Sequence, residues 1–268
     1  RFHDAPRVAN ELVNKTTISS AAASARMRLI EGIFRHDRTP LMGINPDKAP
    51  PEKSMYLSIF AKGGLHLDTG SGFELREPPA EDPLRLLPAI RRIVFMIRQG
   101  LGSRVSVKEI LDDLRRPPFG VRDGLSPLLL AAVLKMRSHE LALYEAGTFI
   151  ANFGALEFMR LTKAPANFEV QYCSVEGVRA EVFDRLANAF VRSVTDRRPV
   201  LLDIVIELSQ FAAKLPEYTR KSRKLEPTAA AVRDALLTAT EPATLMFVTL
   251  PKACGLPEFD LMTPATEE

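Results

Sequence analysis

The chain has 268 residues and a formal net charge of +3, with 46% hydrophobic and 26% charged residues. This balance is typical of a soluble globular protein that buries one large core or two modest ones, and the small charge neither requires nor excludes an acidic partner. Glycine is scarce and tryptophan is absent, which predicts a mainly helical fold because helix-forming residues dominate. Cys173 and Cys254 are too isolated for a disulfide framework or a zinc site, so we expect two partly buried thiols in a cytoplasmic protein.

The first 104 residues are expected to form an N-terminal helical region. The chain opens on Arg1 without the pattern of a secretory leader, so we expect a piece of a larger protein. Ser19 or Ser20 suits the N-cap of a long helix, because its hydroxyl can accept a backbone N–H of the first turn. Prolines keep the next segment irregular until Ser54. The expected elements are helices at 10–13, 19–35 and 54–62, a turn with a strand at 70–75, and a helix at 83–99.

Residues 105–174 are expected to form a winged-helix-like unit. Apolar residues at 107, 110, 111 and 114 share one helical face, and two prolines end that helix. The apolar run 125–136 is too short to span a membrane and predicts a buried helix. Two short strands are expected around Glu145-Ala146-Gly147, followed by a helix at 156–161 and an alternating strand at 168–172. The order helix, helix, hairpin, helix, strand suits a variant winged helix.

Residues 175–268 are expected to form a C-terminal helical region. Helices are predicted at 178–190, from Pro199 onward, at 229–240 and from 245 onward, with a frayed tail after Pro257. In the second of these helices Ile204, Leu208 and Phe211 oppose a polar face, which predicts that they point to the core. The whole chain is therefore predicted to be mainly α-helical, with small β elements and an embedded winged-helix-like unit.

Motifs of enzyme sites are missing from the sequence. No glycine is followed directly by lysine and then serine or threonine, so a phosphate loop is absent. The segment 100–104, GLGSR, follows a predicted helix rather than a strand, which favours a plain helix terminus. His66 and Asp68 would share a face of an extended segment, but one pair cannot fill the coordination sphere of a metal. We expect no catalytic residue, metal or cofactor, and a small metal-dependent hydrolase is kept as a third alternative for this pair alone.

Two basic clusters are candidates for phosphate contacts, because lysine and arginine along one surface release counterions when they meet nucleic acid. The first cluster surrounds the double-proline turn and comprises Arg115, Arg116 and Arg122. The second cluster follows Tyr218 and comprises Arg220, Lys221, Arg223 and Lys224. Aspartates at 112, 113 and 123 dilute the first cluster, so the second is the stronger electrostatic candidate. A solvated surface is the ordinary explanation of both.

One segment resembles a known group of proteins. The sequence LRRPPFGVRDG at 114–124, continued by PLLLAA at 127–132, is similar to a region downstream of the nucleotide-binding module in large bacterial P-loop ATPases of phage-defence type, including BREX-like ones. Shorter stretches fit the same pattern, at 10–12, 19–22, 144–145, 147–149, 168–171 and 250–255. The resemblance implies an accessory helical and winged-helix region of a multidomain antiviral defence protein, and it carries over no active-site residue.

The leading hypothesis is a non-catalytic module that contacts nucleic acid, or other domains or subunits, inside a larger defence ATPase. The runner-up is a free-standing protein-interaction module without a nucleic-acid role. Neither hypothesis involves a membrane. The hypotheses differ in whether the exposed basic residues meet phosphates, and binding measurements across a salt series distinguish them.

Overall fold

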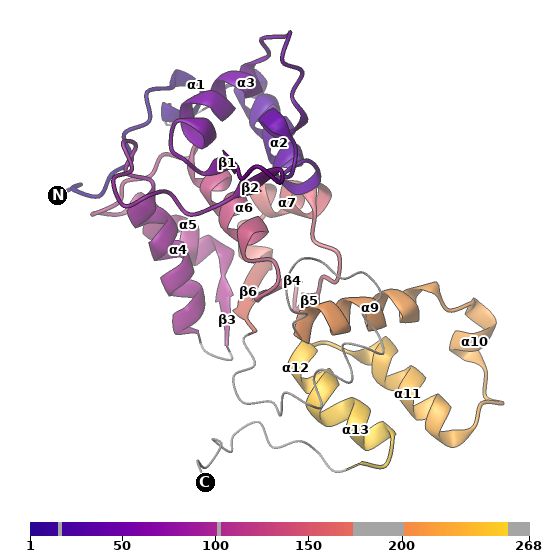
Figure 1. Ribbon diagram of the computed structural model, residues 1–268. Helices are drawn as coiled ribbons and strands as arrows, with labels where there is room; N and C mark the ends of the chain where they lie inside the picture. Colours follow the sequence, from indigo (N-terminus) through magenta and orange to yellow (C-terminus); the bar gives the residue numbers. More distant parts are fainter. Residues whose placement is uncertain (16–17, 101–102, 174–200, 257–268) are drawn as a thin grey trace. The chain divides into compact units, whose positions relative to one another are not determined.

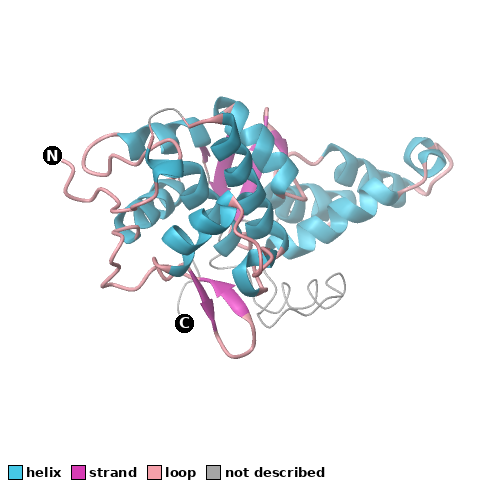
Figure 2. Ribbon diagram, turned by 90° about the horizontal axis from the view of Figure 1, so that it is seen from above, coloured by secondary structure: helices cyan, strands magenta, loops and turns pink. Residues whose placement is uncertain are grey.

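The computed structural model of the chain describes residues 1–15, 18–100, 103–173 and 201–256. It confirms the predicted class, because the chain is mainly α-helical with small antiparallel strand pairs (Figures 1 and 2). The first compact unit combines Arg1–Ser138 with Phe153–Gln171, and the second combines His139–Asn152 with Tyr172–Glu268. The elements expected to form a winged-helix-like unit at 105–174 are thus shared between the two units. The winged helix itself, and the boundaries at 104 and 174, stay predictions.

Side-chain caps start the first two helices. The sequence predicted the cap at Ser19, whereas Asn10 was expected inside the first helix and is instead its cap. Helix α1 is Glu11–Asn14, and Asn10 Oδ1 accepts a backbone N–H of its first turn at 2.9 Å. Helix α2 is Ser20–Arg35, and Ser19 Oγ accepts a backbone N–H of its first turn at 3.2 Å. Each oxygen satisfies a donor that has no partner inside the helix. Local chemistry is therefore enough to place both helix starts.

The next helix begins earlier than predicted. A short turn of 3-10 helix, η1 (Pro40–Gly43), precedes α3 (Pro51–Met55), which continues into the π-helical segment η2 (Tyr56–Ala61). The prediction placed the start at Ser54, but Pro51 stands in the first turn, where a missing N–H costs no hydrogen bond. Prolines here start the helix rather than keep the chain irregular.

A two-stranded hairpin and a long helix follow. Strands β1 (His66–Asp68) and β2 (Phe73–Leu75) pair antiparallel, and α4 is Leu87–Gln99. The prediction began α4 at residue 83. The Asp82 carboxylate instead accepts three backbone N–H groups between residues 84 and 87, and Arg85 has a positive φ of 52°. The helix can begin only after this turn.

The core of the first unit is centred on α6 (Ser126–Met136), whose residues from Ser126 to Leu134 are all buried. Helices α2 and α4 pack against it (Figure 1). Helix α5 (Val107–Arg115) buries its four predicted apolar positions and packs against α4. Strand β3 (Arg104–Ser106) pairs antiparallel with β6 (Phe168–Tyr172). The prediction of a buried helix at 125–136 is confirmed.

Aromatic rings pack between α7 (Ala155–Lys163) and α2. The ring of Phe34 lies 5.7 Å from that of Phe153 and 5.6 Å from that of Phe158, measured between centroids. Such tilted and edge-to-face pairs stabilise a core beyond the area that they bury. A 3-10 turn, η3 (Pro165–Asn167), then leads into β6, and the first unit ends at Gln171 of that strand.

The second unit contains the predicted hairpin. Strands β4 (Leu141–Glu145) and β5 (Thr148–Phe149) join through Ala146 and Gly147, both with positive φ, as a two-residue hairpin turn requires. Tyr144 is fully buried and clusters with Leu202 of α9. The hairpin therefore belongs to a core that helical residues much later in the chain complete.

The rest of the second unit is a helical cluster. Its further elements are α9 (Leu201–Lys214), α10 (Glu217–Lys221), α11 (Pro227–Thr238), α12 (Pro242–Thr244), η4 (Leu245–Thr249) and α13 (Leu250–Ala253). Ile204 and Leu208 are buried as predicted, but Phe211 is 57% exposed, so its assignment to the core was wrong. The helix predicted at 178–190, the start at Pro199 and the tail after Pro257 lie outside the described residues.

Candidate functional site

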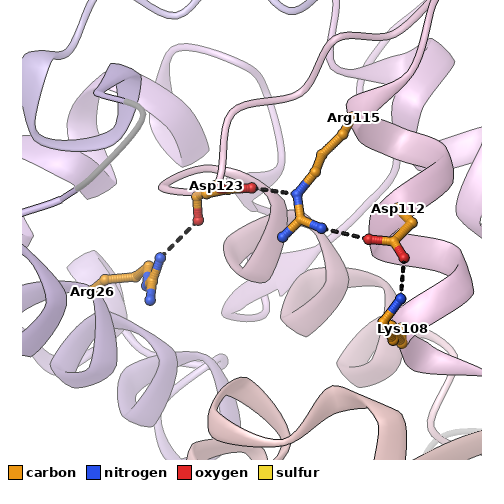
Figure 3. Close-up of polar contacts among 5 residues, drawn as sticks. All are labelled: Arg26, Lys108, Asp112, Arg115 and Asp123. Atoms are coloured by element: carbon orange, nitrogen blue, oxygen red, sulfur yellow. Dashed lines mark hydrogen bonds and ion pairs between the residues drawn. The ribbon is translucent and has the colours of Figure 1, made fainter.

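The first basic cluster lies around the turn between α5 and α6, which contains a cis Pro117–Pro118 peptide bond. Arg115 Nε donates to Asp123 at 2.6 Å, and its Nη1 donates to Asp112 at 2.5 Å (Figure 3). Lys108 donates to the other oxygen of Asp112 at 2.6 Å. The hydrogen bond from Lys108 is the main reason that the pKa of Asp112 is lowered. Arg115 is thus bound to two carboxylates, and little of its charge is left for a phosphate.

Arg26 of α2 holds the same turn from the other side. Its Nη1 donates to the main-chain carbonyl of Asp123 at 2.9 Å, across 97 positions of sequence (Figure 3). Burial lowers the pKa of Arg26, while the charge of Asp123 raises it. Its Nε is buried and has no hydrogen-bond partner within the described residues. Arg26 was not predicted from the sequence, because nothing in the local pattern of α2 signals a contact so distant in the chain.

The acidic pair in α5 is engaged rather than solvated. Asp113 accepts two hydrogen bonds from Arg92 of α4, at 2.8 and 2.9 Å. These bonds are the main cause of the lowered pKa of Asp113, and they raise the pKa of Arg92. Asp112 is paired as well, so neither aspartate of α5 faces water alone. Their role is to join α5 to α4 and to the turn after it.

The two remaining arginines of the first cluster, Arg116 and Arg122, are exposed. Arg122 lines a groove of about 750 Å³ beside the N-terminal segment. The lining is mixed, with arginines at 7, 115 and 122, one carboxylate at 123 and several apolar residues. Phe2 lies against Gly120 at the rim and is 50% exposed. The groove can accommodate an anionic group or an apolar side chain.

The second basic cluster lies on α10 and the residues after it. Arg220 Nε donates to the Leu215 carbonyl at 2.8 Å, and its Nη2 donates to the Ala213 carbonyl at 3.1 Å. Both acceptors lie at the carboxyl end of α9, where carbonyl groups have no partner inside the helix and carry partial negative charge. Arg220 therefore has a structural role that the sequence run did not indicate.

The other members of the second cluster point to water. Lys221 pairs with Glu217 at 2.6 Å, and both side chains are at least three-quarters exposed. Arg223 and Lys224 are exposed, and within the described residues no ion pair joins either side chain to a carboxylate. An exposed ion pair such as that of Lys221 is weak and competes readily with another anion. The described geometry thus leaves three cations on this segment open to an anionic partner.

The proposed metal pair does not form a site. His66 is buried, its Nδ1 lies 2.9 Å from the Tyr56 hydroxyl, and its Nε2 lies 2.8 Å from the Asp37 carbonyl. A carbonyl can only accept, so Nε2 carries the proton and Nδ1 accepts from Tyr56. Asp68 is exposed and accepts the N–H of Gly70. No cluster of three or more potential metal ligands occurs among the described residues.

The two cysteines differ in their surroundings. Burial raises the pKa of Cys173 to about 11, and its N–H donates to the Glu140 carbonyl. Cys254 is exposed, so the expectation of two partly buried thiols was right only for Cys173. A thiol with so high a pKa is a poor nucleophile at neutral pH.

Comparisons with known proteins give no assignment. No family model, curated protein or solved structure matches the chain. Within the described residues, no helix is both long enough and apolar enough to cross a bilayer. The placement of the two basic clusters is therefore the main guide to function.

Proposed function

We propose that this chain is a non-catalytic accessory module of a larger bacterial defence-type P-loop ATPase, and that it contacts nucleic acid through Lys221, Arg223 and Lys224. The observation that supports this proposal most directly is the exposure of these three cations on one short segment. The link to an ATPase comes from the sequence resemblance. A phosphate-loop signature upstream in the source gene would support that link, and a gene without one would argue against it.

The balance of charge along this segment favours an anionic partner. Between residues 214 and 226 there are five lysines and arginines against two glutamates. Arg220 is bound to main-chain carbonyls, so its charge is not cancelled by a carboxylate. Cations concentrated on one surface bind phosphates mainly by releasing counterions, which makes binding weaken steeply as salt is added. The salt dependence therefore reports how many cations touch phosphates.

Fluorescence anisotropy with a labelled oligonucleotide between about 50 and 200 mM salt tests the proposal. The informative variant is Lys221→Gln, Arg223→Gln, Lys224→Gln, because it spares Arg220 and its hydrogen bonds to α9. For each removed cation that touches a phosphate in the parent, the slope of log K against log salt should flatten by roughly 0.7 to 0.9. Removing three such cations would therefore flatten it by about 2 to 3.

A matched control variant removes the same charge elsewhere. Lys15, Lys48 and Lys62 are exposed residues of the first unit, and changing all three to glutamine lowers the net charge equally. This control should keep the slope of the parent. Equal slopes for the parent and the Lys221, Arg223, Lys224 variant would rule out this surface as the phosphate-binding one.

A second phosphate-binding surface can involve Arg116 and Arg122 of the first cluster. Both are exposed, whereas Arg115 is bound to Asp112 and Asp123. We expect Arg116→Gln with Arg122→Gln to weaken binding, and Arg115→Gln to act chiefly through the stability of the turn. Circular dichroism melts of each variant separate weaker phosphate binding from a loosened fold.

The groove beside Phe2 favours the alternative function, a protein-interaction module without a nucleic-acid role. Its apolar lining and the half-exposed Phe2 ring suit a side chain from a partner protein. If the parent binds neither single-stranded nor duplex nucleic acid at the lowest salt, this alternative replaces the leading proposal. Phe2→Ala would then be the first variant to test against candidate partner domains.

A further inference from the structure

We infer that the surface of α10 binds single-stranded nucleic acid in preference to duplex, with Tyr218 as a platform on which an unpaired base stacks. This inference rests on the proposed nucleic-acid role and specifies the ligand of the same surface. Tyr218 is uncharged and stands outside both basic clusters, so its part in binding is separate from theirs.

Tyr218 is the most exposed large side chain with apolar character within the described residues, at 74%. No hydrogen bond or ring contact to a described residue involves its side chain. The ring therefore contributes little to the packing of the second unit. A flat aromatic face left open beside cations is the combination that single-strand-binding proteins use, since every base has a face that can stack.

The ring and the cations share one surface. Tyr218 and Lys221 are three positions apart on α10, so their side chains lie on the same face of that helix. Arg223 and Lys224 follow directly, where the chain leaves the helix in an extended conformation at Ser222. A strand whose base rests on Tyr218 would thus have its backbone phosphates next to these three cations.

Two arginines hold this segment in place. Arg220 donates to carbonyls at the end of α9, and Arg233 of α11 donates to the carbonyls of Thr219 and Ser222, at 3.3 and 2.5 Å. The backbone that carries the ring and the cations is therefore fixed on both sides. A surface that is already ordered loses less conformational entropy when it binds a ligand.

Single strands suit this surface better than duplex for a steric reason. In a duplex each base face is covered by its neighbour, so Tyr218 could stack only at an end, and the cations would meet phosphates alone. In a single strand the bases are free to leave their neighbours and stack on a protein ring. Helix α10 has only five residues, and a helix of about 7.5 Å offers few side chains for reading a groove.

Anisotropy with the full chain tests the inference. The probes are an oligo-dT and an oligo-rU of about 16 nucleotides, and a blunt hairpin duplex with a stem of similar length. The parent should bind one or both single strands more tightly than the duplex. Tyr218→Ala should weaken single-strand binding by about 5- to 150-fold, as expected for the loss of one stacked base. Its salt slope should stay that of the parent, because no charge is lost.

Two further substitutions identify the aromatic face as the cause. Tyr218→Phe keeps the ring and should bind like the parent, whereas Tyr218→Leu keeps an apolar side chain without a ring and should bind like Tyr218→Ala. Leu156→Ala removes another highly exposed apolar side chain, 61% exposed in the first unit, and should have no effect.

The outcomes separate this inference from the proposed function. Salt-dependent binding in which Tyr218→Ala is silent, or in which the duplex is bound as tightly as single strands, would overturn the stacking role and leave the nucleic-acid role standing. No binding of any probe by the parent would overturn both. Ring-dependent binding of either single strand supports the inference.

Discussion

Replacing Leu129 by alanine should destabilise the first unit strongly. Leu129 is fully buried in α6, the helix on which α2 and α4 pack. The change removes about three carbon groups, and at about 0.8 kcal/mol for each this costs about 2.4 kcal/mol of transfer free energy. An unrelaxed void of about 50 Å³ adds about 1.2 kcal/mol. The expected loss is therefore about 3 to 4 kcal/mol, a large part of the roughly 5 to 15 kcal/mol that holds a typical domain folded.

Urea denaturation followed by far-ultraviolet circular dichroism measures this loss, because the chain has no tryptophan to report by fluorescence. The midpoint should fall by about 1 to 4 M for a typical dependence on urea of about 1 to 3 kcal/mol per M. If the two units unfold in separate transitions, only that of the first unit should move. The matched control is Leu156→Ala, the same chemical change at a side chain that is 61% exposed, which should cost at most about 0.5 kcal/mol. Equal midpoints for Leu129→Ala and its control would show that α6 is not the centre of the core.

Two further predictions concern titrating groups. Burial lowers the pKa of His66 in the folded state, although Asp37 raises it, so the unfolded chain takes up this proton more readily. The stability contributed by neutral His66, which accepts from Tyr56, should be present above about pH 6.5 and be lost as the pH falls below that value. The urea midpoint of His66→Asn should therefore fall less between about pH 7 and pH 5 than that of the parent. Equal falls of the midpoint in the two proteins would contradict this. Cys254 should react with a thiol reagent at neutral pH within the dead time of mixing. Cys173, with a pKa of about 11, should react only when the second unit unfolds. A Cys254→Ser variant that still labels rapidly would show that Cys173 is accessible.

Signals confined to a few neighbouring residues were enough to predict much of the fold. The cap Ser19 places α2, and the turn at Ala146 and Gly147 places the hairpin. In each case the residue that carries the signal also makes the contact, or adopts the backbone conformation, that defines the element. The apolar run of α6 identified the core for a similar reason, since it has no polar face to turn toward water.

Features that depend on distant residues could not be predicted in this way. The period of α9 shows which face is apolar, but not that Phe211 on that face is 57% exposed. The sequence shows that Arg115 is charged, but it does not show that two carboxylates bind this side chain. Arg220 and Arg223 look alike in the run, yet only Arg220 is bound to the end of α9. Pairing is set by tertiary structure, so the sequence could name the basic residues of the candidate site but not the partner that each of them has.

The position of the β4–β5 hairpin has a consequence for how the chain folds during synthesis. The hairpin leaves the ribosome well before α9, although Tyr144 is covered by Leu202 in the same core. At about 5 to 20 residues per second, its apolar side stays uncovered for several seconds. The first unit is complete in sequence before α9 is made, since its last segment ends at Gln171. A nascent chain paused between the two stages would therefore expose Tyr144 and its neighbours to chaperones, while the first unit was already folded.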